Sequence, residues 1–232
     1  MDEIAPKFTF ATLAADKLNS IVKIVDQGIV LTSWQSRRLA GTEQEQQRLN
    51  IIQSYLTDRH ITLMNEATIW ARAIYPLLLL AERDNVQVWS QVGLTAQYPH
   101  FKLEGIVDGV VGNCTSGTIN TPYLVVVEAK RALESNNPQY QLYGEMLAAA
   151  WLNWRQEPNI QPQTIFGCYT ISDTWTFVSG IVSGFETDYP MMTIESSPEY
   201  IQRFEAATIF QIVKFIVTDY CENKNPNTTS SK

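Results

Sequence analysis

Two neighbouring apolar runs, residues 105–111 and 123–127, dominate the hydrophobic pattern in the middle of the chain. Both are rich in Val and Ile, which favour strands, and the intervening residues Gly112 to Gly117 favour a turn. The pattern therefore predicts an antiparallel hairpin. The second run is almost continuously apolar, which is typical of a strand buried on both faces, so we expect it in the centre of a sheet.

Helical spacing and strand-like alternation of apolar residues predict the other elements. Thr42 and Glu45 have the spacing of a capping box, which predicts that a helix starts here. Pro76 is expected to kink its helix or to constrain the start of that helix. The predicted helices are 12–26, 42–58, 65–82, 139–155 and one that begins at Ser197, and the further predicted strands are 86–97, 164–170 and 175–182.

These elements predict a single α/β domain in which a central mixed β-sheet is flanked by helices on both faces. Within residues 1–222 we expect a helical N-terminal extension (1–60), a core (61–182) and a C-terminal helix (197–222). Residues 223–232 are almost entirely polar, so we expect a disordered tail there.

Composition limits the classes of partner. The chain of 232 residues is 45% hydrophobic and 18% charged, which is ordinary for a globular protein. Its 17 basic and 24 acidic residues give a net charge of −7, which argues against broad electrostatic adhesion to nucleic acid. A local basic groove remains compatible with this charge, and Lys102, Lys130 and Arg131 are its candidate residues.

The sequence shows neither a signal peptide nor closely spaced pairs of cysteines. The first residues lack the basic start and apolar core of a signal peptide, and the longest apolar block, 74–81, is far too short for a membrane span. Cys114, Cys168 and Cys221 show no Cys-x-x-Cys spacing, so we expect neither a disulfide framework nor a zinc ribbon. The expectation is a soluble, cytoplasmic protein without a membrane partner.

Charged residues interrupt both strands of the predicted hairpin. Residues i and i+2 of a strand share a face, so Glu128 and Lys130 point the same way, and the register can bring Asp108 opposite them. Two buried carboxylates repel each other, and a Mg²⁺ ion bound by them and by the Ala129 carbonyl would remove the conflict. The alternative is that Asp108 ends a strand at the surface and that Glu128 pairs with Lys130 or Arg131.

A family resemblance rests on these residues. Asp108, followed after residues 109–127 by Glu128-Ala129-Lys130, resembles the core motif of the PD-(D/E)XK nuclease superfamily. Val107 stands where the superfamily's name has a proline, a departure that many members share. The similarity extends from about Glu66 to Tyr143.

Two flanking segments add to the resemblance. Gln139 and Tyr143 resemble the Gln-x-x-x-Tyr motif of the RecB-like branch. Upstream, residues 65–78, with Glu66 and Arg72, are similar to the first helix of the nuclease domain in type I restriction enzyme R subunits, whose glutamate faces the metal site. From the residues alone, Glu66 could instead stabilise only its own helix, and Tyr143 could be a core residue beside an exposed Gln139.

The resemblance implies a restriction endonuclease-like fold and a Mg²⁺-dependent endonuclease that hydrolyses DNA, with Mn²⁺ as a substitute ion. It implies that Asp108, Glu128 and the Ala129 carbonyl bind the metal. Lys130 would then orient or deprotonate the attacking water, and Glu66 would complete the acidic cluster. The expected substrate contacts are Gln139, Tyr143, Lys102 and Arg131.

The implied setting is restriction, defence or DNA repair, with a homodimer or partner subunits supplying target recognition. A different class stays open, namely a catalytically silent DNA-binding or regulatory subunit that keeps the nuclease fold. Other chemistries lack their motifs: His60 and His100 stand in no zinc-binding pattern, and no nucleotide-binding Gly-rich loop occurs in the sequence.

Overall fold

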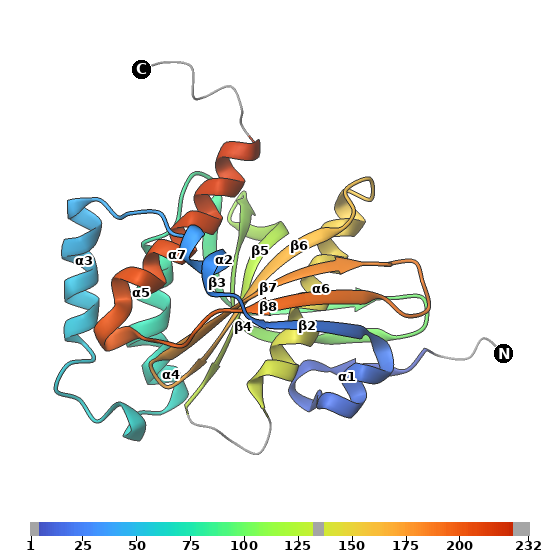
Figure 1. Ribbon diagram of the computed structural model, residues 1–232, viewed down its shortest axis with the longest axis horizontal. Coiled ribbons are helices and arrows are strands. Elements are labelled where there is room, and N and C mark those ends of the chain that lie inside the picture. Colours follow the sequence, from blue (N-terminus) through green and yellow to red (C-terminus); the bar gives the residue numbers. More distant parts are fainter. Residues whose placement is uncertain (1–4, 132–136, 225–232) are drawn as a thin grey trace.

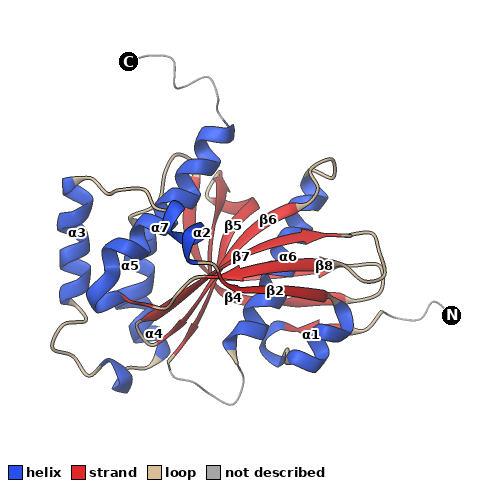
Figure 2. Ribbon diagram, viewed as in Figure 1, coloured by secondary structure: helices blue, strands red, loops and turns tan. Residues whose placement is uncertain are grey.

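The computed structural model describes residues 5–131 and 137–224. These residues form an α/β structure with a mixed sheet flanked by helices, as predicted (Figures 1 and 2). The strands are β1 (Lys7–Thr9), β2 (Lys23–Ile29), β3 (Val86–Gln97), β4 (Lys102–Thr115), β5 (Thr118–Lys130), β6 (Gln163–Ile171), β7 (Thr174–Ser183), β8 (Met191–Ser196) and β9 (Tyr200–Ile201). The α-helices are α1 (Ala15–Ile21), α2 (Leu31–Ser36), α3 (Glu43–Ser54), α4 (Glu66–Ile69), α5 (Tyr75–Leu79), α6 (Pro138–Gln156) and α7 (Gln202–Lys224). Shorter helical turns are η1 (Phe10–Thr12), η2 (Ile61–Leu63) and the π-helical turn η3 (Trp70–Ile74).

The predicted hairpin forms the middle of the sheet. Strands run in the order β1-β4-β5-β6-β7-β8-β2, with β3 paired to β4 and β9 paired to β7. The antiparallel pairing of β4 with β5 is confirmed, and Ser116 and Gly117 turn the chain with positive φ angles. β5 lies between antiparallel β4 and parallel β6, so its central position is confirmed.

Helices cover the sheet on two sides, and each side has its own core. One core packs α2, α3, α4, η3, α5 and α7 against the sheet, and we refer to it as the α7 face. The other packs η1, α1 and α6 against the opposite side, which we call the α6 face. Along β5, Val125 and Val127 belong to the α7 face, whereas Val126 belongs to the α6 face, as strand alternation requires.

The β3–β4 ribbon changes its surroundings halfway along its length. Val88 and its partner Val111 pack in the α7 face, but Val92 and its partner Val107, on the same side of the ribbon, pack in the α6 face. On the other side of the ribbon, Val110 of β4 is buried in the α6 face. The residues of β3 that point to this side are exposed to solvent from Gln91 to Gln97. Asp108 lies on this second side, at the point where the cover ends.

The prediction for the N-terminal sixty residues was wrong in part. Residues 12–26 do not form one helix: α1 ends at Ile21, and Lys23–Ile29 is strand β2, paired in parallel with β8. β1 also joins the sheet, beside β4. The apolar residues of β2 fit a helical repeat by sequence, but pairing with a distant strand decides their conformation. The capping box of Thr42 and Glu45 is confirmed, and its helix ends at Ser54.

The predicted helix 65–82 is interrupted. It consists of α4, the π-helical turn η3 and α5, in which Pro76 occupies the first turn. Because proline has no N–H to donate, a widened turn before Pro76 accommodates the missing hydrogen bond. The expected disturbance by Pro76 is therefore present, as a π-helical turn.

Elsewhere the predicted elements are largely confirmed. β3, α6 and the β6–β7 hairpin lie where the pattern placed them, with Asn137 capping α6 and Pro138 in its first turn. The last helix was misplaced: it begins at Gln202, after the short strand β9, and not at Ser197. The predicted tail, 223–232, was wrong for Asn223 and Lys224, which belong to α7, and its remaining residues lie outside the described part of the chain. Within the described residues, no helix is long and apolar enough to cross a membrane.

Candidate active site

The candidate site lies where β4 and β5 separate, which we call the fork. The β4–β5 ladder ends at the pair Gly109–Val127, while β5 continues beside β6 as far as Lys130. Val110 pairs with Val126 and both pack in the α6 face. Two residues further along each strand, Asp108 and Glu128 therefore share one side of the sheet.

Asp108 bridges the fork with its carboxylate. Its Oδ2 atom accepts a hydrogen bond of 2.9 Å from the backbone N–H of Ala129, and Oδ1 accepts one of 3.1 Å from Nε2 of Gln91. Gln91 lies opposite Asp108 on β3 and has a positive φ of 54°. Asp108 thus lies within β4 and replaces a missing ladder bond, so the alternative that it merely ends a surface strand is wrong.

Glu128 is held by neighbours of two kinds. Its side chain is only 1% exposed, and its Oε1 atom lies 2.5 Å from Nζ of Lys130. Its Oε2 atom accepts a 2.7 Å hydrogen bond from Nε2 of Gln141 on α6. The ion pair with Lys130 is the contact that the alternative interpretation expected, and it coexists with the position of Asp108 on the same side of the sheet.

Asp108, Glu128 and Lys130 form what we call the charged cluster, and the pKa values of Glu128 and Lys130 are shifted there. Burial and the nearby charge of Asp108 raise the pKa of Glu128 to about 7, although Lys130 opposes this. Burial alone would lower the pKa of Lys130, but Glu128, Glu66 and Asp108 outweigh it and raise that pKa. The cluster therefore has an unfavourable concentration of negative charge that one ammonium group offsets only in part.

A third carboxyl group lies behind Glu128. Glu145 of α6 is completely buried, and its Oε1 atom accepts a 3.1 Å hydrogen bond from the same Nε2 atom of Gln141. Its Oε2 atom has no hydrogen-bond partner among the described residues. Burial and the proximity of Glu128 raise the pKa of Glu145 well above its usual value.

Glu66 approaches the cluster from the helical side. It is the first residue of α4, where Asn65 caps the helix by accepting a 2.8 Å bond from the N–H of Thr68. Its charge contributes to the raised pKa of Lys130, which places it within electrostatic reach of the cluster. The segment packs closely on β4, because a Cβ atom on Gly109 would lie 2.3 Å from the ring of Trp70.

The other predicted residues are placed differently. Gln139 donates a 2.5 Å hydrogen bond to Tyr143, which is buried, so this pair shares one side of α6. Gln141 lies about 200° further around the helix than Gln139, so the pair lies along the opposite flank. Lys102 forms an ion pair with Glu104 at 2.6 Å, six residues and roughly 20 Å along β4 from Asp108. Arg131 is exposed beside Lys130.

Sequence reasoning missed Gln91, Gln141 and Glu145. Glu145 carried a signal, because it is the one charged residue between Leu142 and Ala150, where all other residues are small, apolar or aromatic. Gln141 lies between the two residues of the supposed motif and was assigned no role. Gln91 could not be found, because its contact depends on the strand register and on its unusual φ angle.

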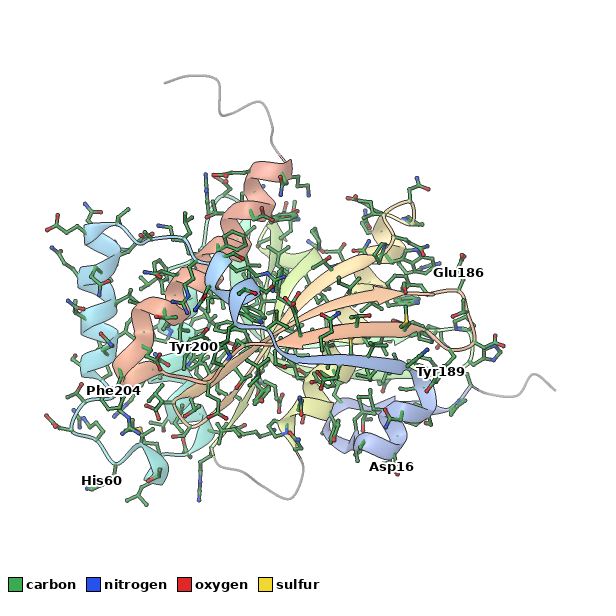
Figure 3. The ribbon with its side chains drawn as sticks, viewed as in Figure 1. Asp16, His60, Glu186, Tyr189, Tyr200 and Phe204 are labelled. Atoms are coloured by element: carbon green, nitrogen blue, oxygen red, sulfur yellow. The ribbon has the colours of Figure 1, made fainter. Side chains whose placement is uncertain are left out.

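Neither histidine belongs to the charged cluster. His60 is exposed at the outer margin of the helical side of the molecule (Figure 3). His100 is exposed as well and lies 2.7 Å from the carboxylate of Asp188.

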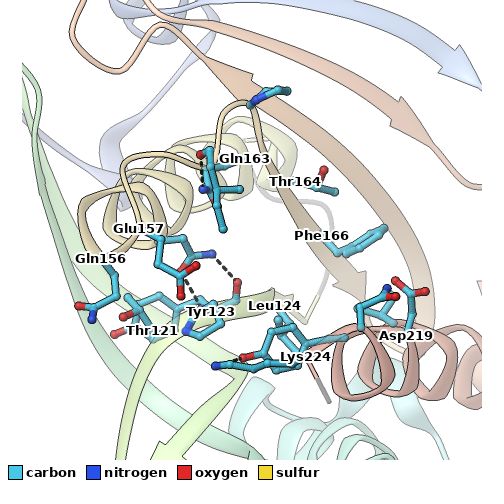
Figure 4. A pocket seen from close by; sticks show the side chains of 17 residues that line it. Thr121, Tyr123, Leu124, Gln156, Glu157, Gln163, Thr164, Phe166, Asp219 and Lys224 are labelled. Carbon is cyan, nitrogen blue, oxygen red and sulfur yellow. Dashed lines mark hydrogen bonds between the residues drawn. The ribbon is translucent and has the colours of Figure 1, made fainter. Parts of the chain in front are cut away.

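A cavity of about 570 Å³ lies at the other end of β5, bordered by α6, β6 and α7 (Figure 4). Its wall includes Tyr123, Leu124 and Phe166, and it contains no residue of the charged cluster. Asn153 in its wall exchanges two hydrogen bonds of 2.8 Å with the backbone of Tyr123. Its size suits a small molecule. Its charged residues, Glu157, Asp219 and Lys224, are exposed to solvent, whereas Glu128 at the fork is buried, so we place the chemistry at the fork.

The donor set at the fork suits a hard divalent cation. Mg²⁺ typically takes one or two carboxylates and completes its shell with water and substrate oxygens. Asp108 and Glu128 supply two carboxylates, and the cost of burying Glu128 would fall beside a cation. Across residues 5–131 and 137–224, no group of three or more His, Cys, Asp or Glu side chains is arranged to coordinate a metal ion. The ligands that remain are therefore the two carboxylates and the Ala129 carbonyl.

The sequence matches no known family and no curated protein.

Proposed function

We propose that this protein is a metal-dependent nuclease of the restriction endonuclease-like class that hydrolyses phosphodiester bonds of DNA. The observation that supports this most strongly is the convergence of Asp108, Glu128 and Lys130 at the fork. Burying the Glu128 carboxylate beside that of Asp108 is costly, and the single ammonium group does not balance this cost. A bound cation would balance it.

Three groups at the fork are assigned to metal binding. Asp108 and Glu128, with the Ala129 carbonyl, would hold Mg²⁺ or Mn²⁺. The bound ion would lower the pKa of a water molecule and stabilise the charge that develops on the phosphate. Asp108 is already fixed by its bonds to Ala129 and Gln91, so its carboxylate needs little reorganisation to serve as a ligand.

Lys130 acts as a donor in this proposal. Its pKa is raised, so it stays protonated at neutral pH and cannot readily accept a proton. Its side chain is 22% exposed, in contrast to that of Glu128, so the ammonium group faces the solvent side of the site. These two facts favour orienting the attacking water or the scissile phosphate over deprotonating the water.

A basic hollow near Glu66 suits the DNA backbone better than Lys102 does. Arg59 and Arg72, with Tyr55, border a hollow of about 350 Å³. Arg72 follows Glu66 by six residues, about 9 Å along the helix axis. Both arginines are exposed, and a guanidinium group can donate two parallel hydrogen bonds to a phosphate.

A cleavage assay tests the proposal. Supercoiled, linear, branched and single-stranded DNA are incubated with the wild-type protein in Mg²⁺ or Mn²⁺, with EDTA as the control. We expect metal-dependent cleavage of at least one substrate and its loss in Glu128→Ala. DNA binding without cleavage of any substrate, alone or with candidate partner subunits, would favour the silent binding subunit. The ion pair between Lys130 and Glu128 is the observation that favours this second function, because it neutralises the expected metal ligand.

A further inference from the structure

Helix α6 brings two polar residues to the buried side of Glu128. From Leu142 to Ala150 every residue of this helix is buried, and Glu145 is the one charged residue among them. Its carboxyl group is completely buried, and one of its oxygens has no partner among the described residues. A buried carboxyl group is costly, and a Leu or Met would pack on a sheet without that cost. Packing of α6 therefore does not explain Glu145.

Gln141 connects Glu145 to Glu128. Its Nε2 atom lies 2.7 Å from Oε2 of Glu128 and 3.1 Å from Oε1 of Glu145. An amide nitrogen carries two hydrogens, so each carboxyl group receives one of them. In this orientation the amide satisfies both carboxyl groups, whichever of them carries a proton, because each has an oxygen that accepts.

We propose that Gln141 and Glu145 are positioning residues, which hold Oε2 of Glu128 from the α6 face and so present Oε1 to a divalent cation. The inference rests on the proposed metal-dependent function. In the structure Oε1 already faces a cation, the ammonium group of Lys130 at 2.5 Å. Glu145 in turn fixes the second hydrogen of the Gln141 amide, so the amide cannot rotate away from Glu128.

A matched pair of variants tests the proposal by calorimetric titration of Mn²⁺. Gln141→Met keeps the length of the side chain but removes both hydrogen bonds. Gln139→Met makes the same change on the opposite flank of α6, where the amide bonds, among the described residues, to Asn137 and Tyr143. We expect Gln141→Met to weaken Mn²⁺ binding by roughly 10- to 100-fold, the usual effect of losing a residue that orients a metal ligand, and Gln139→Met to bind like the wild type.

Glu145 variants and thermal melting separate positioning from folding. Glu145→Gln retains an oxygen that accepts from Gln141 and should keep Mn²⁺ binding, whereas Glu145→Leu removes this acceptor and should weaken binding as Gln141→Met does. Melting without metal should show all four variants folded. Should Gln141→Met bind Mn²⁺ like the wild type, or Gln139→Met lose as much affinity as Gln141→Met, the positioning role is overturned while the nuclease proposal stands. A wild-type protein that binds no Mn²⁺ overturns both.

Discussion

The two ends of β5 present opposite kinds of site. Near Tyr123 and Leu124 there is a cavity of about 570 Å³, at which Asn153 and the backbone of Tyr123 exchange two hydrogen bonds. Near Glu128 the structure has buried carboxyl groups, a raised pKa and an oxygen of Glu145 without a partner among the described residues. The first end is distinguished by its cavity volume, and the second by its buried carboxyl groups. Catalysis requires groups held against their electrostatic preference, so the charged end is the better candidate.

The largest expected difference between the two ends is catalytic. Lys130→Ala should reduce metal-dependent DNA cleavage by several orders of magnitude, because it removes the group that orients water or phosphate. Gln156→Ala changes an exposed residue of the cavity wall and should leave cleavage unchanged. Initial rates on one DNA substrate, at saturating Mg²⁺, measure both effects.

The opposite result, in which Gln156→Ala is inactive and Lys130→Ala is active, would contradict this comparison of the two ends. A loss of cleavage in Gln156→Ala together with near-normal rates in Lys130→Ala would move the chemistry to the other end of β5. Circular dichroism of both variants shows whether either loss reflects misfolding.

The second difference concerns pH. The pKa of Glu128 is raised from an ordinary value of 4.5 to about 7, so the folded protein binds more protons than the unfolded chain between these pH values. The free energy of unfolding of the metal-free protein should therefore fall as pH rises from about 4.5 to about 7, by up to about 3 kcal/mol from this group. Glu145 acts in the same direction.

Urea denaturation in EDTA at several pH values measures this dependence. Glu128→Gln removes the titrating group and should flatten the curve, mostly by stabilising the protein above pH 7. A wild-type curve that rises with pH over the same interval, or that Glu128→Gln leaves unchanged, would show that the carboxylate is not under electrostatic stress.

Stability should respond differently to polar substitutions at the two ends. Asn153→Ala leaves the N–H and C=O of Tyr123 without partners and should cost about 2 kcal/mol of unfolding free energy. Asp108→Asn keeps an oxygen for the N–H of Ala129 and relieves the repulsion with Glu128, so the change should stay within about 1 kcal/mol. Chemical denaturation at pH 8 without metal compares them, and a larger loss in Asp108→Asn would mark Asp108 as a structural residue.

The smallest expected effect is on DNA affinity. Arg72→Ala should weaken binding modestly and lower the slope of log affinity against log salt concentration by about one, as expected for one lost phosphate contact. Lys102→Ala should leave the slope unchanged, because that ammonium group pairs with Glu104 far from the fork. Fluorescence anisotropy with a catalytically inactive background gives both slopes, and the reverse pattern would restore Lys102 as a substrate contact.

Local pattern was enough to predict most of the fold. The β4–β5 hairpin, the β6–β7 hairpin, the α3 capping box and α6 follow from residues close together in sequence, and all are present. β2 was missed because its partner β8 lies more than 160 residues away and its apolar positions also fit a helix. Long-range pairing, which sequence spacing does not reveal, decides such segments.

The candidate site was predictable where it depends on strand alternation. Glu128 and Lys130 had to share a face, and Asp108 follows from the register of the hairpin. Gln141 was not predictable in the same way, because the angle at which α6 crosses β5 selects which helix positions reach Glu128. The structure shows that Gln141, and not Gln139 or Tyr143, makes this contact.

Metal binding at the fork is the central claim, and one measurement tests it most directly. Mn²⁺ is titrated calorimetrically at pH 8 into the wild-type protein and into Asp108→Asn, which keeps the fold but removes one carboxylate. The account predicts a single class of site in the wild type and its loss in Asp108→Asn. Absence of binding in the wild type, or equal binding in the two proteins, would contradict it.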